Sequence, residues 1–296
     1  KQCRQAAVMI DGIAERFERK LVLTLVGPSG SGKSTLLNAL VGVDDLSDIG
    51  HERPTTDHLV VFSANAGDSD QLVEELDSEI VETRSNPAAV RFEHVLLVDT
   101  PDTDSRAFRK HIPIVEKTIA RSDMLICVFD AENPKRRDHV DFLARFIPNF
   151  SGESLVCVLN KCDRLDEAEL KDQIVPDFLE HIRTGWQVPA DRVFCISARR
   201  NLIDPDWDAA AEPRHDFDEF EDLQQLVVNT INQAGFVIDR RIENVRRLRD
   251  FVFEEAGRHV LGHQAVLSDA AEHMAATEKK AIEDALSGLQ ESGAQQ

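Results

Sequence analysis

A glycine-rich segment at residues 27–35 has the composition and spacing needed to bind phosphate. It reads Gly27, Pro28, Ser29, Gly30, Ser31, Gly32, Lys33, Ser34, Thr35. The spacing G-x-x-x-x-G-K-[ST] stands between an apolar run and a helical pattern, which is the context in which it binds nucleotide phosphates. Glycines let backbone N–H groups turn towards a phosphate, and the helix N-terminus that follows favours an anion. We therefore expect the whole segment to bind a nucleotide, with Lys33 at the β- and γ-phosphates and Ser34 as a ligand of Mg²⁺.

A second polar segment follows a later apolar run and has the chemistry to select the base. It consists of Asn160, Lys161, Cys162 and Asp163. The carboxylate of Asp163 can accept hydrogen bonds from guanine N1–H and the 2-amino group, whereas adenine presents an acceptor at N1. The glycine-rich segment alone would also suit an ATPase, so this second segment decides the base. The sequence predicts guanine.

In this order, the two segments resemble the motifs of the P-loop GTPases, whose NKxD motif binds guanine. The resemblance implies that Asn160 supports the base and the phosphate loop, while the stem of Lys161 covers the face of the base. Ser197, Ala198 and Arg199 resemble the SAK motif of the same family, which implies a backbone N–H contact with guanine O6. The expected ligands are GTP and GDP, together with Mg²⁺.

Two further segments are expected to complete the Mg²⁺ site. Residues 99–102 resemble the DxPG motif, which implies that Asp99 binds Mg²⁺ through water. Asp102 stands where the family has glycine, and it brings a negative charge close to the γ-phosphate. The loop before the second apolar run contains two adjacent threonines. Thr56 is our first choice for the Mg²⁺ ligand because of its distance to that run, and Thr55 is the second.

The group that orients the attacking water is not evident, since no Gln directly follows residues 95–98. Gly30 stands where dynamins have Ser and where potassium-activated GTPases have Asn. Ser29 and Ser31 are the neighbouring substitutes, and backbone contact with phosphate is the simpler role for both. Arg53 is either an arginine finger or a solvated loop residue. Dimerisation would be another way to supply the missing group.

Short apolar runs alternate with helical patterns along the central part of the chain. The runs lie at residues 21–26, 59–62, 95–98, 124–129, 154–159 and 192–196. Rich in Val, Leu and Ile without polar alternation, they are typical of strands buried on both faces. The helical patterns lie at residues 33–40, 111–121, 136–146, 167–182 and 219–233. This alternation predicts an α/β fold with a mostly parallel central sheet flanked by helices, and it places the motifs at the carboxyl ends of the strands.

Both ends of the chain differ from this core. Residues 1–20 carry a helical apolar stripe, and apolar residues recur at helical steps after residue 235, where Gly257 and Gly262 are candidate breaks. We predict an N-terminal helix at 1–20, a GTPase domain at 21–235 and a C-terminal helical segment at 236–296. The two ends would form one helical neck or stalk; the alternative is that both helices pack on the α/β domain.

Charge and composition exclude several classes of function. The chain has 54 Asp+Glu against 34 Lys+Arg, a net charge of −20, which argues against nucleic acid as a partner because phosphate backbones demand cationic surfaces. No uncharged apolar run is long enough to span a bilayer. The five cysteines are an odd number and lack zinc spacing. We expect a reduced, cytoplasmic protein.

The long loop at residues 40–59, an acidic insertion at about 65–92 and the terminal helices resemble the layout of bacterial dynamin-like proteins and mitofusins. The resemblance implies hydrolysis of GTP to GDP and phosphate, a homodimer through the GTPase domains, and coupling to the helical stalk. A membrane or protein partner would bind through parts outside this chain, and the intact protein would then be peripheral at a membrane. The alternatives are an Era- or TrmE-like regulatory GTPase, against which the charge argues, and a non-hydrolysing GTP-dependent scaffold, which Asp102 favours.

Overall fold

The computed structural model describes most of the chain. The described residues are 19–47, 58–76, 79–87, 89–101, 111–135, 137–147, 150, 152–186, 192–204, 217–231 and 234–293. They divide into two compact units, one that holds the sheet and ends at Asn244, and one that includes the chain from Val245 onward. The N-terminal helix expected at residues 1–20 falls outside the described residues up to position 18, and the domain boundaries at 20 and 235 stay predictions.

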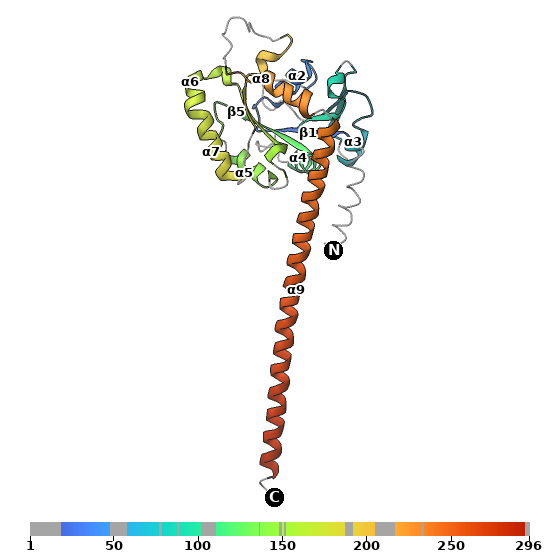
Figure 1. Ribbon diagram of the computed structural model, residues 1–296, viewed down its shortest axis with the longest axis vertical. Coiled ribbons are helices and arrows are strands. Elements are labelled where there is room, and N and C mark those ends of the chain that lie inside the picture. Colours follow the sequence, from blue (N-terminus) through green and yellow to red (C-terminus); the bar gives the residue numbers. More distant parts are fainter. Residues whose placement is uncertain are drawn as a thin grey trace. The chain divides into compact units, whose positions relative to one another are not determined.

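The first unit is built on a β-sheet that contains β1 and β5 (Figure 1). The sheet has seven strands in the order β3-β2-β4-β1-β5-β6-β7. The strands are β1 Leu21–Val26, β2 Leu59–Ser63, β3 Val81–Ser85, β4 Val95–Asp99, β5 Met124–Asp130, β6 Leu155–Asn160 and β7 Val193–Ile196. Every pairing is parallel except that of β2 with β4. All residues of β1, β2, β4 and β6 are buried, as expected for strands covered on both faces. The predicted fold class is confirmed.

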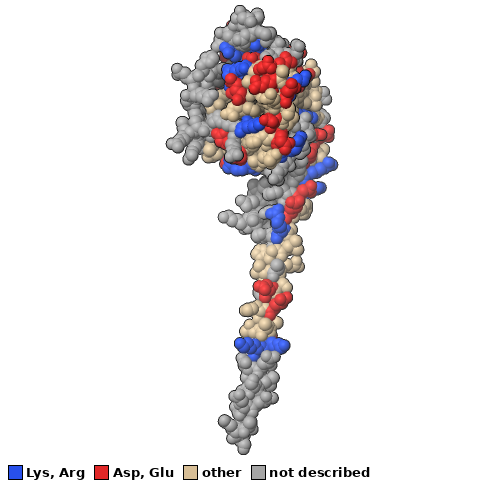
Figure 2. Space-filling view, turned by 90° about the vertical axis from the view of Figure 1, so that its left-hand side faces the viewer, with Lys and Arg blue, Asp and Glu red and all other residues tan. Residues whose placement is uncertain are grey.

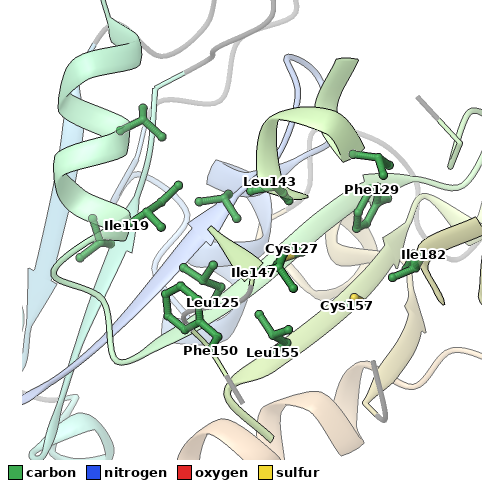
Figure 3. Close-up of a cluster of buried hydrophobic side chains, with 14 of the residues drawn as sticks. Ile119, Leu125, Cys127, Phe129, Leu143, Ile147, Phe150, Leu155, Cys157 and Ile182 are labelled. Carbon is green, nitrogen blue, oxygen red and sulfur yellow. The ribbon is translucent and has the colours of Figure 1, made fainter. Parts of the chain in front are cut away.

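Helices cover both faces of this sheet. One face packs against α3 Asp70–Leu76, α4 Ile112–Ile119, α5 Arg137–Ala144 and α7 Val175–Trp186. Figure 3 shows part of this layer, in which Cys127 and Phe129 of β5 and Cys157 of β6 lie among side chains of the covering helices. The other face packs against α2 Lys33–Val41 and α8 Phe220–Gln225. The buried side chains of the two layers fix the positions of the strand ends.

The segment indicated by sequence only as an acidic insertion contributes to this architecture. It contains α3, β3 and a 3₁₀ turn, Val90–Phe92, and β3 extends the sheet by pairing in parallel with β2. Strand β3 reads VETRS and has no buried residue, so it lacks the apolar run that marks the inner strands. Charged residues are typical of an exposed edge strand.

Two predicted helices contain a wider turn than expected. The segment predicted as one helix at residues 167–182 forms α6 Glu167–Glu169, a π-helical stretch Leu170–Ile174, and α7. The segment predicted at residues 219–233 forms α8 and a second π-helical stretch, Leu226–Ile231. The apolar periodicity found these helices but could not indicate the change of hydrogen-bond pattern.

The C-terminal helical segment is the 60-residue helix α9, Ala234–Gly293. It continues through Gly257 and Gly262, so neither candidate break is real. Several large apolar side chains of α9 are exposed: Phe253, Val260, Leu261, Val266, Leu267 and Met274. Figure 2 shows charged residues on this helix separated by stretches of uncharged ones. Within the described residues, no helix combines the length and the apolar character that a membrane span requires.

Candidate nucleotide-binding site

The glycine-rich segment joins the end of β1, in the middle of the sheet, to the start of α2. Gly30 and Gly32 have φ values of 74° and 90°, a left-handed backbone that favours glycine. At Gly27, a Cβ would lie 2.5 Å from the carbonyl oxygen of Val128 and 2.7 Å from Ser31 Oγ. The segment can therefore keep this tight curve only with glycine at these positions, and it leaves the backbone open to a phosphate.

The polar groups inside this loop suit an anionic ligand. Lys33 is buried, and its Nζ donates hydrogen bonds to the carbonyl oxygens of Gly27 at 3.0 Å and Pro28 at 3.3 Å. Ser31 Oγ is buried and has no hydrogen-bond partner among the described residues. A buried hydroxyl of this kind is costly unless a ligand oxygen satisfies it. Lys33 is the predicted phosphate contact, whereas for Ser31 the sequence favoured a backbone contact alone, so its buried hydroxyl is a further polar group in this loop.

Ser34 and Asp99, each predicted to bind Mg²⁺, hydrogen-bond to each other beside the phosphate loop. Asp99 is the last residue of β4, which pairs directly with β1, and Ser34 Oγ donates to Asp99 Oδ2 at 2.6 Å. A second hydroxyl, Ser47 Oγ, donates to the same carboxylate oxygen at 2.8 Å. Hydroxyl, carboxylate and water oxygens are the ligands that Mg²⁺ prefers, so these residues fit the cation that the family implies.

Asn160 connects the phosphate loop to residues 197–199, the second segment expected to contact guanine (called the guanine loop below). Its Nδ2 donates to the Ser31 carbonyl oxygen at 2.8 Å, and its Oδ1 accepts from the backbone N–H of Ala198 at 3.0 Å. The approach is so close that a Cβ at Gly32 would lie 2.3 Å from Asn160 Nδ2. Asn160 thus contacts the phosphate loop, and its support of the base stays a prediction.

The other residues of the guanine-selecting motif lie at the ends of β6 and β7. The backbone N–H of Asp163 donates to Ser197 Oγ at 3.0 Å, and Arg200 Nε lies 3.7 Å from Asp163 Oδ2. Lys161 has a left-handed φ of 68°, and its Nζ binds Asp130 Oδ2 at 2.5 Å. Asp130 ends β5 and therefore orients the lysine stem that we expect to cover the base.

Cys162 has a structural rather than a chemical role in this motif. Its side chain is buried, and its Sγ donates to the carbonyl oxygen of Leu159 at 3.2 Å. The neighbouring Cys195 thiol and burial raise the pKa of the Cys162 thiol well above its usual range. A thiol that stays protonated is a poor nucleophile and a poor metal ligand.

The structure gathers the predicted residues of the phosphate loop, Asp99, the guanine-selecting motif and residues 197–199 along one end of the parallel strands. Thr55, Thr56, Arg53 and Asp102 lie outside the described residues, so their roles stay predictions. Sequence reasoning missed the residues that position the motifs: Asn38, Ser47, Asp130 and Arg200. None of them belongs to a spaced pattern, although Asp130 could have been noted as a polar residue at the end of an apolar run.

We expect Asn160→Ala to lower the free energy of unfolding by about 2–4 kcal/mol, because it removes two hydrogen bonds and leaves a buried N–H and a buried carbonyl without partners. Nucleotide affinity should fall with it, since both loops lose their connection. Urea unfolding of the nucleotide-free protein measures the first effect, and equilibrium titration the second. Asn65→Ala, which removes an exposed side-chain amide, is the matched control and should change neither.

Comparisons with known proteins agree with this geometry. A family model described as a 50S ribosome-binding GTPase matches residues 22–161. Two structures of an oligomerised bacterial dynamin pair align with TM-scores of 0.51 and 0.54, at 16% and 17% identity, over 87% and 91% of this chain. The alignments cover 54% and 47% of those chains, so the present chain spans about half their length.

Era from Aquifex aeolicus, bound to GDP and aluminium fluoride, aligns with a TM-score of 0.43 at 21% identity, over 60% of this chain and 52% of that one. No curated protein matches the chain. The dynamin alignments show that the fold is shared, and the family match covers β1 through the first residues of the guanine-selecting motif. The sheet order, the tightly curved glycine-rich loop at residues 27–32 and the family match together show that the sheet unit contains a P-loop GTPase domain, as the sequence motifs predicted.

Proposed function

We propose that this protein binds GTP and GDP with Mg²⁺ and hydrolyses GTP to GDP and phosphate, as the GTPase domain of a dynamin-like protein. The observation that carries the proposal is the position of Asn160, which hydrogen-bonds the phosphate loop on one side and the predicted guanine loop on the other. One buried side chain thereby holds both halves of a nucleotide site together. Asp163 follows three residues later, and its backbone N–H donates to Ser197 Oγ, next to the Ala198 that Asn160 binds.

In the proposed reaction, water attacks the γ-phosphorus and GDP leaves. Lys33 exchanges its carbonyl partners, Gly27 and Pro28, for phosphate oxygens and stabilises the charge on them. Ser34 and Asp99 hold the cation, with Thr56, or else Thr55, completing the set. Bound Mg²⁺ supplies charge neutralisation at the phosphates. Backbone N–H groups of the phosphate loop orient the transferred group, so catalysis is mainly positioning and electrostatics.

The dynamin-like assignment is supported by the extent of the structural likeness and by α9. The two bacterial dynamin alignments include most of this chain, and those proteins are described as a pair that senses and tethers membranes over long range. In α9, the exposed residues Phe253, Val260, Leu267 and Met274 are spaced by one heptad each, which matches one of the two apolar positions of a coiled-coil repeat. We propose that the GTPase domains pair as a homodimer and that α9 belongs to a helical stalk.

A ribosome-linked regulatory GTPase is the alternative, favoured by the description of the matched family. The net charge of −20 argues against it, because RNA binding requires a cationic surface. A nucleotide-dependent scaffold without turnover is the third candidate. RNA retention at physiological salt would support the ribosome-linked GTPase. Tight GTP binding without hydrolysis at any protein concentration would support the scaffold.

We expect the specific rate of GTP hydrolysis to rise with protein concentration as a nucleotide-dependent dimer forms, because dimerisation would complete the catalytic site. Phosphate release measured over a dilution series, with mass followed by light scattering, tests this. ATP should not be hydrolysed, and Lys33→Ala should be inactive at every concentration. A rate that stays constant per molecule while the protein remains monomeric would contradict the dimer but not the GTPase.

A further inference from the structure

We infer that Ser47 is a positioning residue for the Mg²⁺ site, held by Asn38 so that its hydroxyl keeps the Asp99 carboxylate in one orientation. The inference rests on the proposed function, because it concerns how the chain would hold the cation that accompanies the nucleotide. It adds a residue that neither the motifs nor the family resemblance indicated.

The contact between Ser47 and Asp99 is short and buried. Ser47 Oγ donates to Asp99 Oδ2 at 2.8 Å, the same oxygen that accepts from Ser34 Oγ at 2.6 Å. Asp99 is fully buried and Ser47 is 3% exposed. Ser34 is itself a proposed ligand of the cation, whereas Ser47 comes from the loop after α2. Ser47 is therefore a donor to this carboxylate that does not depend on the phosphate loop.

Asn38 fixes the backbone of Ser47 with both ends of its side-chain amide. Asn38 Oδ1 accepts from the Ser47 backbone N–H at 2.9 Å, and Asn38 Nδ2 donates to the Ser47 carbonyl oxygen at 2.9 Å. The second Nδ2 hydrogen bond, at 2.6 Å, goes to the carbonyl oxygen of Asp44. Asn38 is fully buried on α2, the helix that begins at Lys33 and Ser34. Asn38 thus fixes the position of the Ser47 hydroxyl relative to α2, the helix that carries the predicted phosphate and metal ligands.

The same loop is anchored at its other end near the guanine side of the site. The Asp44 carboxylate accepts from the backbone N–H groups of Ile203 at 2.9 Å and Asp204 at 2.6 Å. These residues follow the 3₁₀ turn Ala198–Asn201, which is expected to contact the base. Residues 43–47 therefore bridge the two ends of the nucleotide site, and they are held at both.

An aspartate binds a hydrated cation well only when its carboxylate is held in a fixed orientation. Hydrogen bonds that orient metal ligands typically account for a 10- to 100-fold difference in metal affinity. Two donors on one oxygen restrict the rotation of Asp99, and one of the two is lost in Ser47→Ala. The chemistry predicts a loss of cation affinity with little effect on the binding of nucleotide alone.

The test is the release of a fluorescent GDP analogue from the full chain over a range of Mg²⁺ concentrations. For Ser47→Ala, we expect the Mg²⁺ concentration that half-maximally slows release to rise about 10-fold. GDP affinity in excess EDTA should remain as in the unsubstituted protein. Ser47→Thr, which keeps the hydroxyl, should restore the Mg²⁺ dependence.

Ser63→Ala is the matched control, since it removes a similarly buried hydroxyl that does not contact Asp99 but donates to the carbonyl oxygen of Asn65 at 2.8 Å. Ser63 lies on β2, three residues after Val60, which pairs with Asp99. An unchanged Mg²⁺ midpoint for Ser47→Ala would overturn the inference. If Ser47→Ala lowered the GDP affinity measured in EDTA and the thermal stability together, with no separate effect on the Mg²⁺ dependence, the inference would also be overturned. Ser47 would then have a structural role. If the unsubstituted protein retains no GDP at any Mg²⁺ concentration, the proposed function itself fails.

Discussion

Replacing Asp163 with alanine is expected to weaken GTP and GDP binding by about 10²- to 10⁴-fold while the protein stays folded. Two hydrogen bonds from guanine to a carboxylate contribute about 1.5–3 kcal/mol each, and about 1.4 kcal/mol corresponds to a factor of ten. The hydrogen bond from the Asp163 backbone N–H to Ser197 Oγ does not involve the side chain, so alanine retains it and the loop should keep its position. Equilibrium titration with a fluorescent GDP analogue measures the affinity.

Asp166→Ala is the matched control for this substitution. Asp166 lies three residues further on and caps α6 by accepting from the backbone N–H groups of Ala168 and Glu169. Its loss should cost about 1 kcal/mol of stability without affecting the nucleotide. Inosine triphosphate, which lacks the 2-amino group, should bind the unsubstituted protein more weakly than GTP, and Asp163→Ala should no longer distinguish the two. A variant that still preferred GTP would show that Asp163 does not select the base.

Gly32→Ala is expected to lower the free energy of unfolding of the sheet unit by about 3–5 kcal/mol, and to abolish measurable nucleotide binding. An alanine at a φ of 90° stores about 1–3 kcal/mol of strain. Its Cβ would lie 2.3 Å from Asn160 Nδ2, so Asn160 must move and its two hydrogen bonds, about 1–3 kcal/mol each, must weaken. Urea unfolding followed by tryptophan fluorescence, to which the buried Trp186 of the sheet unit contributes, measures the loss.

Gly257→Ala provides the opposite case with the same chemical change. Gly257 lies in α9, where a Cβ would meet no atom within 4 Å, so alanine should stabilise the helix by about 1 kcal/mol. Circular dichroism at the helix wavelength reports this change. If Gly32→Ala and Gly257→Ala lowered the free energy of unfolding by similar amounts, the close contact between Gly32 and Asn160 would not explain the effect of Gly32→Ala.

The inner strands could be predicted because burial on both faces requires uninterrupted apolar runs, which are visible in the sequence. The edge strand β3 could not, because its charged residues face solvent and only its pairing with β2 makes it a strand. The π-helical stretches and the continuity of α9 through its glycines likewise depend on hydrogen bonding and context. A single glycine costs a helix only about 1 kcal/mol, which one long helix can tolerate.

The candidate site followed a similar division. Lys33, Ser34, Asp99, Asn160 and Asp163 occur in spaced motifs at strand ends, and parallel strands bring their carboxyl ends to one edge. Ser47 is one serine in a loop, and its position depends on Asn38, a contact within the folded structure that no spacing indicates.

The position of β1 between β4 and β5 also determines when its strand pairings can form during synthesis. During synthesis, β1 emerges well before either neighbour, and it has both only after the ribosome has passed Asp130. Asn160, which holds the Ser31 carbonyl, emerges later still. Pairings between distant segments form slowly because long loops must close first. The nascent chain therefore carries its phosphate loop early, but the contacts that hold this loop can form only after Asn160 has emerged.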